Sequence, residues 1–104
     1  MNIDARLQDL KAEYTSALPG HIEHIYSYWE SLLNNPADQE AMHQLLDICH
    51  KLSGTAASFG FTSLSHHTRE IEHSLRSLND LSKHAETQQL SQITDLIQQL
   101  GADY

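Results

Sequence analysis

The chain has 104 residues and a formal net charge of −8, from 14 acidic and 6 basic side chains. Nucleic acids and anionic membranes are bound by clustered Lys and Arg, so this composition argues against both as partners. The length fits one domain, residues 1–104, and the low content of Gly and Pro favours helices over a loop-rich fold.

The single cysteine, Cys49, cannot form an internal disulfide and is expected to be a reduced, buried thiol. The first ten residues show no signal-peptide pattern, and no apolar run approaches the ~18 residues that span a membrane. We therefore expect a cytoplasmic protein.

The first half of the chain predicts two helices separated at Pro19. An apolar repeat of three and four residues marks a helix over 3–17, and a similar repeat marks a second helix to Asn34. Pro19 suits the first turn of that second helix. The apolar positions are Ile3, Leu7, Leu10 and Tyr14 in the first helix, and Ile22, Ile25 and Trp29 in the second.

Asn35-Pro36 indicates the start of a central helix, with Asn35 as its cap and Asp38 in its first turn. This helix is expected to stop near Gly60. Thr62 or Ser63 then caps a fourth helix, and a fifth ends at Gly101. The stretch from Asn79 to Thr87 reads as a connection. Short connections favour an all-α, antiparallel four-helix bundle with an additional N-terminal helix.

The central helix presents His50 on the side opposite its apolar stripe. At about 100° per residue, the stripe lies roughly 160–240° away from His50. Its members are Ala41, Leu45, Ile48, Leu52, Ala56 and Phe59. Gly54, one turn later, removes the side chain that would crowd the imidazole. A rigid, exposed histidine of this kind suits contact with another protein.

Three segments resemble histidine-containing phosphotransfer (HPt) domains. They are "HKLSGTAASFG" in the central helix, "REIEHSL" at 69–75, and "EYTSALPGHIEHI" in the first half of the chain. The resemblance implies a phosphorelay intermediate in which His50 takes a phosphoryl group from a receiver aspartate or hybrid kinase. It then passes the group to a response-regulator aspartate. Such a protein needs no cofactor or ATP site of its own, because the partner receiver brings Mg²⁺ and carboxylates.

Around His50 the sequence offers four expected neighbours of the phosphoryl group: Lys51, Ser53, Gly54 and Arg76. The family usually has Lys three residues after the histidine, where this chain has Ser53, whose hydroxyl can still donate one hydrogen bond. Lys51 would have to reach back with its stem, or else is a solvated charge. Arg76 could assist from the next helix, or form an i,i+4 ion pair with Glu72.

The docking surface is expected to include Leu46, His43 and Ala57, which lie on the same side of the helix as His50. The resemblance implies that its partners are response-regulator receiver domains and a sensor histidine kinase. Because the apolar residues can be buried within a single bundle, a monomer is the expected state.

Two other interpretations compete. Glu40-x-x-His43 and Glu70-x-x-His73 match the spacing of di-iron bundles, but both motifs turn away from their cores, so no metal site is expected. A helical adaptor in which His50 is inert is the second alternative, and His50→Gln would leave its signalling unchanged. Among the remaining histidines, His67 is expected to be a hydrogen-bonded, partly buried residue, and the others to be solvated.

Overall fold

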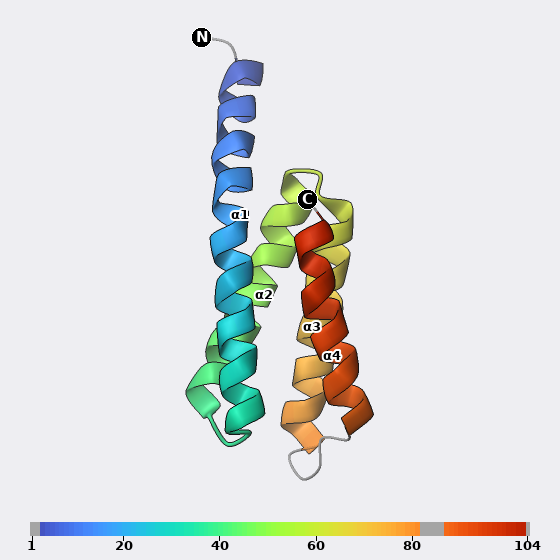
Figure 1. Ribbon diagram of the computed structural model, residues 1–104. Coiled ribbons are helices and arrows are strands. Elements are labelled where there is room, and N and C mark those ends of the chain that lie inside the picture. The colour runs from blue at the N-terminus through green and yellow to red at the C-terminus, as the bar shows by residue number, and fades with distance from the viewer. Residues whose placement is uncertain (1–2, 82–86, 104) are drawn as a thin grey trace.

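The computed structural model describes residues 3–81 and 87–103, and this part of the chain is helical with no strand. Figure 1 shows the helices packed roughly side by side in an elongated body of 55 × 21 × 20 Å. The all-α bundle expected from the sequence is confirmed. The elements are α1 (Ile3–Asn34), α2 (Gln39–Ser58), α3 (Thr62–Leu81), α4 (Thr87–Gln99) and a 3-10 turn, η1 (Leu100–Ala102).

The core is formed by one apolar stripe from each helix, as the periodicity predicts. Burying such side chains stabilises the fold by about 1.5–3 kcal/mol each. Trp29 of α1 is buried, and its indole Nε1 donates a hydrogen bond to the Thr94 hydroxyl of α4 at 2.9 Å. The fully buried side chains include Leu18, Ile25, Leu45, Cys49, Leu64, Thr68, Ile71, Leu75, Ile93, Ile97 and Leu100.

The predicted break at Pro19 is wrong, because α1 runs without interruption from Ile3 to Asn34. A proline inside a helix costs about 3 kcal/mol through its missing N–H and its clash with the preceding turn. Here the apolar stripe keeps its phase across Pro19, from Leu18 to Ile22. A continuous helix therefore buries both halves of the stripe against the same neighbours, which offsets the local cost. The two helices predicted for this half of the chain are therefore a single helix, α1.

The start of α2 also differs from the prediction. The cap is Asp38 rather than Asn35: its carboxylate accepts a hydrogen bond from the Ala41 backbone N–H at 3.0 Å. The Asn35 side-chain oxygen instead accepts from the Ala37 N–H at 3.2 Å, which closes a turn around Pro36. The negative carboxylate is the stronger acceptor for a helix N-terminus.

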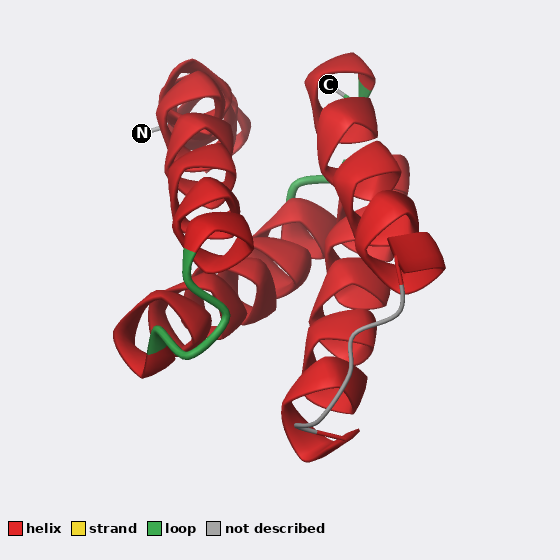
Figure 2. Ribbon diagram, turned by 60° about the horizontal axis from the view of Figure 1, so that its bottom comes forward, coloured by secondary structure: helices red, strands yellow, loops and turns green. Residues whose placement is uncertain are grey.

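Gly60 ends α2 as expected, at a positive φ of 83° that L-residues rarely adopt. The Gly60 and Phe61 backbone N–H groups donate to the carbonyls of Ala57 and Ala56, at 3.1 and 2.8 Å. This pair of hydrogen bonds reverses the chain within a few residues. Figure 2 shows the resulting short connections, which make α2 antiparallel to both α1 and α3.

The predicted connection over 79–87 lies largely outside the described residues, as does His84, while α3 extends to Leu81. At the other end, α4 stops at Gln99, and Gly101 lies within η1 rather than directly capping the α-helix. None of the described helices is long and apolar enough to cross a membrane.

Candidate functional site

The imidazole of His50 lies on the outer face of α2, with 71% of its side chain exposed. Two nearby residues of the helix face the core instead: Cys49 is fully buried, and Leu52 is 4% exposed. Gly54 and Ala57 are exposed beside it. A Cβ placed on Gly54 would meet no other atom within 4 Å, so the space next to His50 is open. The predicted orientation of His50 is confirmed.

A carboxylate from α3 holds the ring. His50 Nδ1 lies 3.3 Å from both carboxylate oxygens of Glu72. Glu72 in turn accepts two hydrogen bonds from Arg76, at 2.7 Å from Nη2 and 3.1 Å from Nε. The Glu72 side chain is only 12% exposed, whereas Arg76 is 58% exposed. The three residues form a chain from a solvent-exposed cation, through a mostly buried carboxylate, to an exposed imidazole.

The pKa of Glu72 is the balance of opposed effects. Burial, the largest of them, raises its pKa, but hydrogen bonds from Arg76 and His50 and their charges lower it, and the net pKa lies below its ordinary value. Glu72 is therefore ionised at neutral pH. The same carboxylate acts on Cys49: burial first, and then the Glu72 charge, raise the pKa of this thiol to about 12, so the thiol is protonated and unreactive.

The contact with Glu72 assigns the tautomer of neutral His50. An ionised carboxylate can only accept hydrogen bonds, so Nδ1 carries the proton. Nε2 then has a free lone pair on the exposed ring. If a positive charge develops on the ring, Glu72 lies in position to stabilise it. An imidazole held in this way can act as a nucleophile through Nε2, because its ring is exposed and its other nitrogen is oriented by a carboxylate.

Ser53 does not lie where the sequence-based expectation put it. It is 6% exposed, and its hydroxyl donates to the His50 backbone carbonyl at 2.8 Å. Its own carbonyl accepts from the Ser65 hydroxyl of α3, also at 2.8 Å. Because Ser53 lies in the α2–α3 interface, its hydroxyl is engaged away from the imidazole. The position at which the resemblance implied a Lys is here part of helix packing.

The two basic neighbours have different surroundings. Lys51 lies in a groove of about 480 Å³ between α1 and α2, and its ammonium pairs with Asp47 at 3.0 Å. Lys51 is therefore an exposed surface charge in this structure, and its ammonium does not reach back toward His50. Arg76 makes the i,i+4 pair with Glu72, which is the second of its two interpretations, and the same carboxylate contacts His50.

The expected docking residues share a face only in part. His43 and Ala57 are exposed on α2. Leu46 is half-buried and packs against the core, contrary to the expectation of an exposed side chain. Leu46, one turn before His50, therefore fills the edge of the core. The surface around His50 is thus less apolar than the sequence predicts.

Glu72 is the site residue that the sequence reasoning missed. The signal was present: Glu72 follows the core residue Ile71, so it lies at the edge of the buried stripe of α3, one turn before Arg76. What no local pattern could supply is its contact with His50, which is 22 residues away in the chain.

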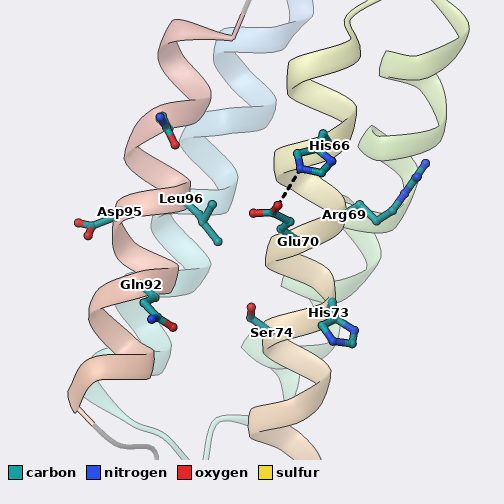
Figure 3. A pocket seen from close by; sticks show the side chains of 9 residues that line it. His66, Arg69, Glu70, His73, Ser74, Gln92, Asp95 and Leu96 are labelled. Atoms are coloured by element: carbon teal, nitrogen blue, oxygen red, sulfur yellow. Dashed lines mark ion pairs between the residues drawn. The ribbon is translucent and has the colours of Figure 1, made fainter.

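The Glu-x-x-His motifs do not converge. A groove of about 670 Å³ lies between α3 and α4 and is lined by Glu70 and His73 among others, as labelled in Figure 3. In it, Glu70 pairs with His66 at 2.7 Å. Glu40 lies on α2 instead, where it accepts a hydrogen bond from Gln44 at 3.0 Å. Within residues 3–81 and 87–103, no three His, Cys, Asp or Glu side chains are grouped as metal ligands.

Comparison with known proteins identifies the family. The model of the Hpt domain matches residues 4–103, which is nearly the whole chain. No curated protein and no solved structure matches significantly. The match agrees with the helical bundle and with an exposed, carboxylate-bound histidine on its central helix. The chain therefore belongs to the Hpt domain family, the phosphotransfer modules of two-component signalling.

Proposed function

We propose that this protein is a phosphorelay intermediate in which His50 Nε2 carries the phosphoryl group. The observation that carries the proposal is the pairing of an imidazole that is 71% exposed with a carboxylate that binds its other nitrogen. Exposure lets the active site of a partner close over Nε2. The bond to Glu72 keeps the lone pair on that atom and the ring in one orientation.

The proposed transfer is a displacement at phosphorus. The Nε2 lone pair attacks the phosphorus of a receiver aspartyl phosphate, the bond from phosphorus to the carboxylate oxygen breaks, and the aspartate leaves as a carboxylate. The ring becomes an N-phosphorylated imidazolium, and its Nδ1–H still donates a hydrogen bond to the Glu72 carboxylate. The reverse displacement by a second aspartate returns the group. Phosphoryl transfer depends mainly on positioning and charge stabilisation, so one oriented imidazole suffices on this side.

The remaining requirements fall to the partners, which we propose to be receiver domains and a sensor or hybrid histidine kinase. The receiver would supply Mg²⁺ and the acidic residues around the phosphoryl group, and this chain would need no cofactor. The receiver would dock on the outer face of α2, where Gly54 and Ala57 leave room around His50 and His43 extends the exposed surface.

The test is phosphoryl transfer from a ³²P-labelled receiver to the wild-type protein, His50→Gln and His43→Gln. His43 is the matched control, because it is an exposed histidine two turns earlier on the same helix. We expect label on the wild type and on His43→Gln, and none on His50→Gln. The label should be acid-labile and base-stable, as a phosphoramidate is. Label retained by His50→Gln would refute the assignment, and signalling unaffected by that change would favour a plain adaptor.

A further inference from the structure

The N-terminal part of α1 extends beyond the rest of the bundle. Figure 1 shows this part, residues 3–13, rising past the α2–α3 turn and the C-terminal end of the fold. All of these residues are exposed, and they include three large apolar side chains. Ile3 is 72% exposed, Leu7 54% and Leu10 40%. We call residues 3–13 the α1 extension.

The exposed apolar side chains form a stripe in phase with the core. Placing Ile3 at 0°, Leu7, Leu10 and Tyr14 fall within about 40° of it at 100° per residue. The buried residue Leu18 continues the same line at about 60°. The α1 extension therefore presents to solvent the face that packs against α2 and α4 further down the same helix. Helices that are apolar on one face bury that face against a partner.

The end of the bundle below this stripe is apolar as well. Tyr14 stacks on Phe59 with ring centroids 4.7 Å apart, and its centroid is 5.9 Å from that of Phe61. The Lys11 ammonium lies 5.3 Å from the Phe61 ring centroid. The α1 extension and this aromatic end thus meet at a corner, and the apolar stripe of the extension is exposed to solvent on that side.

We propose that the occupant of this corner is the α1 extension of a second copy of the chain, paired antiparallel. With Leu7 of each copy beside Leu10 of the other, Ile3 of each copy faces Tyr14 of the other. Each extension then lies over the aromatic end of the other bundle, and the two bundles lie at opposite ends of the pair. The interface is isologous, so the same surface is covered on both copies.

The charges beside the stripe favour this orientation. Arg6 and Glu13 lie on one flank, and Asp4 and Lys11 on the other. In an antiparallel pair related by a two-fold axis, each flank meets the same flank of the other copy. In this register Arg6 of one copy lies opposite position 11 of the other, two residues from Glu13. The offset of the two side chains along the helix axis is therefore about 3 Å, at about 1.5 Å per residue. On the other flank Asp4 comes near Lys11 in the same way.

A parallel pair would bring opposite flanks together. In a parallel coiled coil a residue of one flank meets the residue about five positions later on the facing helix. Arg6 would then meet Lys11, and two positive charges would be adjacent. The charge pattern therefore discriminates between the orientations. The proposed dimer departs from the sequence-based expectation of a monomer, and the reason is that three large apolar side chains of α1 are exposed in one copy.

The area available is small, so the dimer should be weak. With three large apolar side chains from each copy, the contact lies at the low end of specific interfaces, where partners exchange readily. We expect dissociation in the micromolar range, and a mass that rises from monomer to dimer with concentration. The His50 site lies on another part of α2, so this pairing does not depend on the proposed phosphotransfer.

Sedimentation equilibrium of the full chain tests the proposal. Leu7→Glu should weaken dimerisation by at least about 100-fold, because each dimer loses two buried leucines and gains two charges. The matched control is Leu33→Glu, at the other end of the same helix, where the leucine is 44% exposed. It should leave the dimer unchanged. Circular dichroism should show the same helix content for all three proteins.

A charge exchange gives a second, independent measurement. Arg6→Glu alone places a second carboxylate beside Glu13 of the other copy, and Glu13→Arg alone places two guanidinium groups together. Because the two-fold axis gives each dimer two such pairs, each single variant should weaken the dimer about fivefold, the effect of losing two exposed ion pairs in the middle of their usual range. The double variant Arg6→Glu/Glu13→Arg should restore it. A structural role within one copy would not produce this restoration.

The proposal is overturned if the wild type stays monomeric up to millimolar concentration, or if dimerisation is unaffected by Leu7→Glu. It is also overturned if the double charge variant remains as weak as the single ones. A monomeric wild type whose receiver binding is lost in Leu7→Glu would show instead that the α1 extension contacts a receiver.

Discussion

His50 and His67 each place Nδ1 against a carboxylate from another part of the fold, yet the two pairs differ in access. His50 is 71% exposed and lies 3.3 Å from Glu72. His67 is 22% exposed and lies 2.6 Å from Asp103, which is itself 8% exposed. The first pair leaves the far side of the ring open, whereas the second closes the end of the chain onto α3. Similar contacts thus leave one ring accessible, as the proposed phosphotransfer requires, and tie the other ring into the fold.

The difference in access between the two histidines would be removed most directly by covering His50 with a larger neighbouring side chain. Gly54→Gln places a side chain next to the imidazole and should slow transfer from a receiver about 30-fold, the effect of losing a contact worth ~2 kcal/mol at an interface. Gly54→Ala is the control: its Cβ meets nothing within 4 Å. It should transfer normally and be up to ~1 kcal/mol more stable, since Ala is the better helix former. Transfer kinetics and thermal melts measure both, and a normal rate in Gly54→Gln would place the docking surface elsewhere.

Removing the carboxylate of the open pair should have the next largest effect. Glu72→Ala leaves Nδ1 without its acceptor, so we expect transfer to His50 to slow about tenfold, the equivalent of one hydrogen bond to a charged group at ~1.4 kcal/mol. Glu72→Gln keeps an oxygen that can accept from Nδ1–H and should recover most of the rate. Single-turnover transfer from a phosphorylated receiver distinguishes these variants. Equal rates in Glu72→Ala and the wild type would show that Glu72 has no positioning role.

Removing the carboxylate of the closed pair should change stability instead. Asp103→Ala leaves Nδ1 of a mostly buried imidazole without a partner, which should lower the free energy of unfolding by ~1 kcal/mol. Transfer to His50 should keep its wild-type rate. Denaturant unfolding and the same transfer assay give the two values. A loss of transfer without a loss of stability would contradict the structural role of the His67–Asp103 pair.

The smallest effect concerns Arg76, the cation that binds the carboxylate of the open pair. Burial raises the pKa of Glu72 and Arg76 helps to lower it, so Arg76→Ala should raise this pKa. The ionised, paired Glu72 stabilises the fold above the ordinary carboxyl pKa, and this stabilisation is lost as the pH falls through the lower folded-state pKa. In Arg76→Ala the folded-state pKa should lie closer to the ordinary value, so this stabilisation should be smaller and its loss should be complete at a higher pH. A ¹³C NMR titration of the Glu72 carboxyl measures the shift, and an unchanged pKa would rule out the coupling.

The sequence alone determined which residues face inward and which face outward along each helix. The period of about 3.6 residues is a local property, so the outward direction of His50, the burial of Cys49 and the all-α class followed from spacing. The end of α2 near Gly60 was likewise marked by residue type, and there the structure has a positive φ. His67 as a hydrogen-bonded, partly buried residue was also predicted correctly.

Only the tertiary structure decided the contacts between helices. Glu72 meets His50 because of how α3 packs on α2, and the same packing buries Ser53 and half-buries Leu46. These outcomes depend on the rotation and offset of one helix against another, which a repeat within either helix does not specify. The continuity of α1 across Pro19 has the same origin, since burial along both halves of the helix outweighs a local penalty.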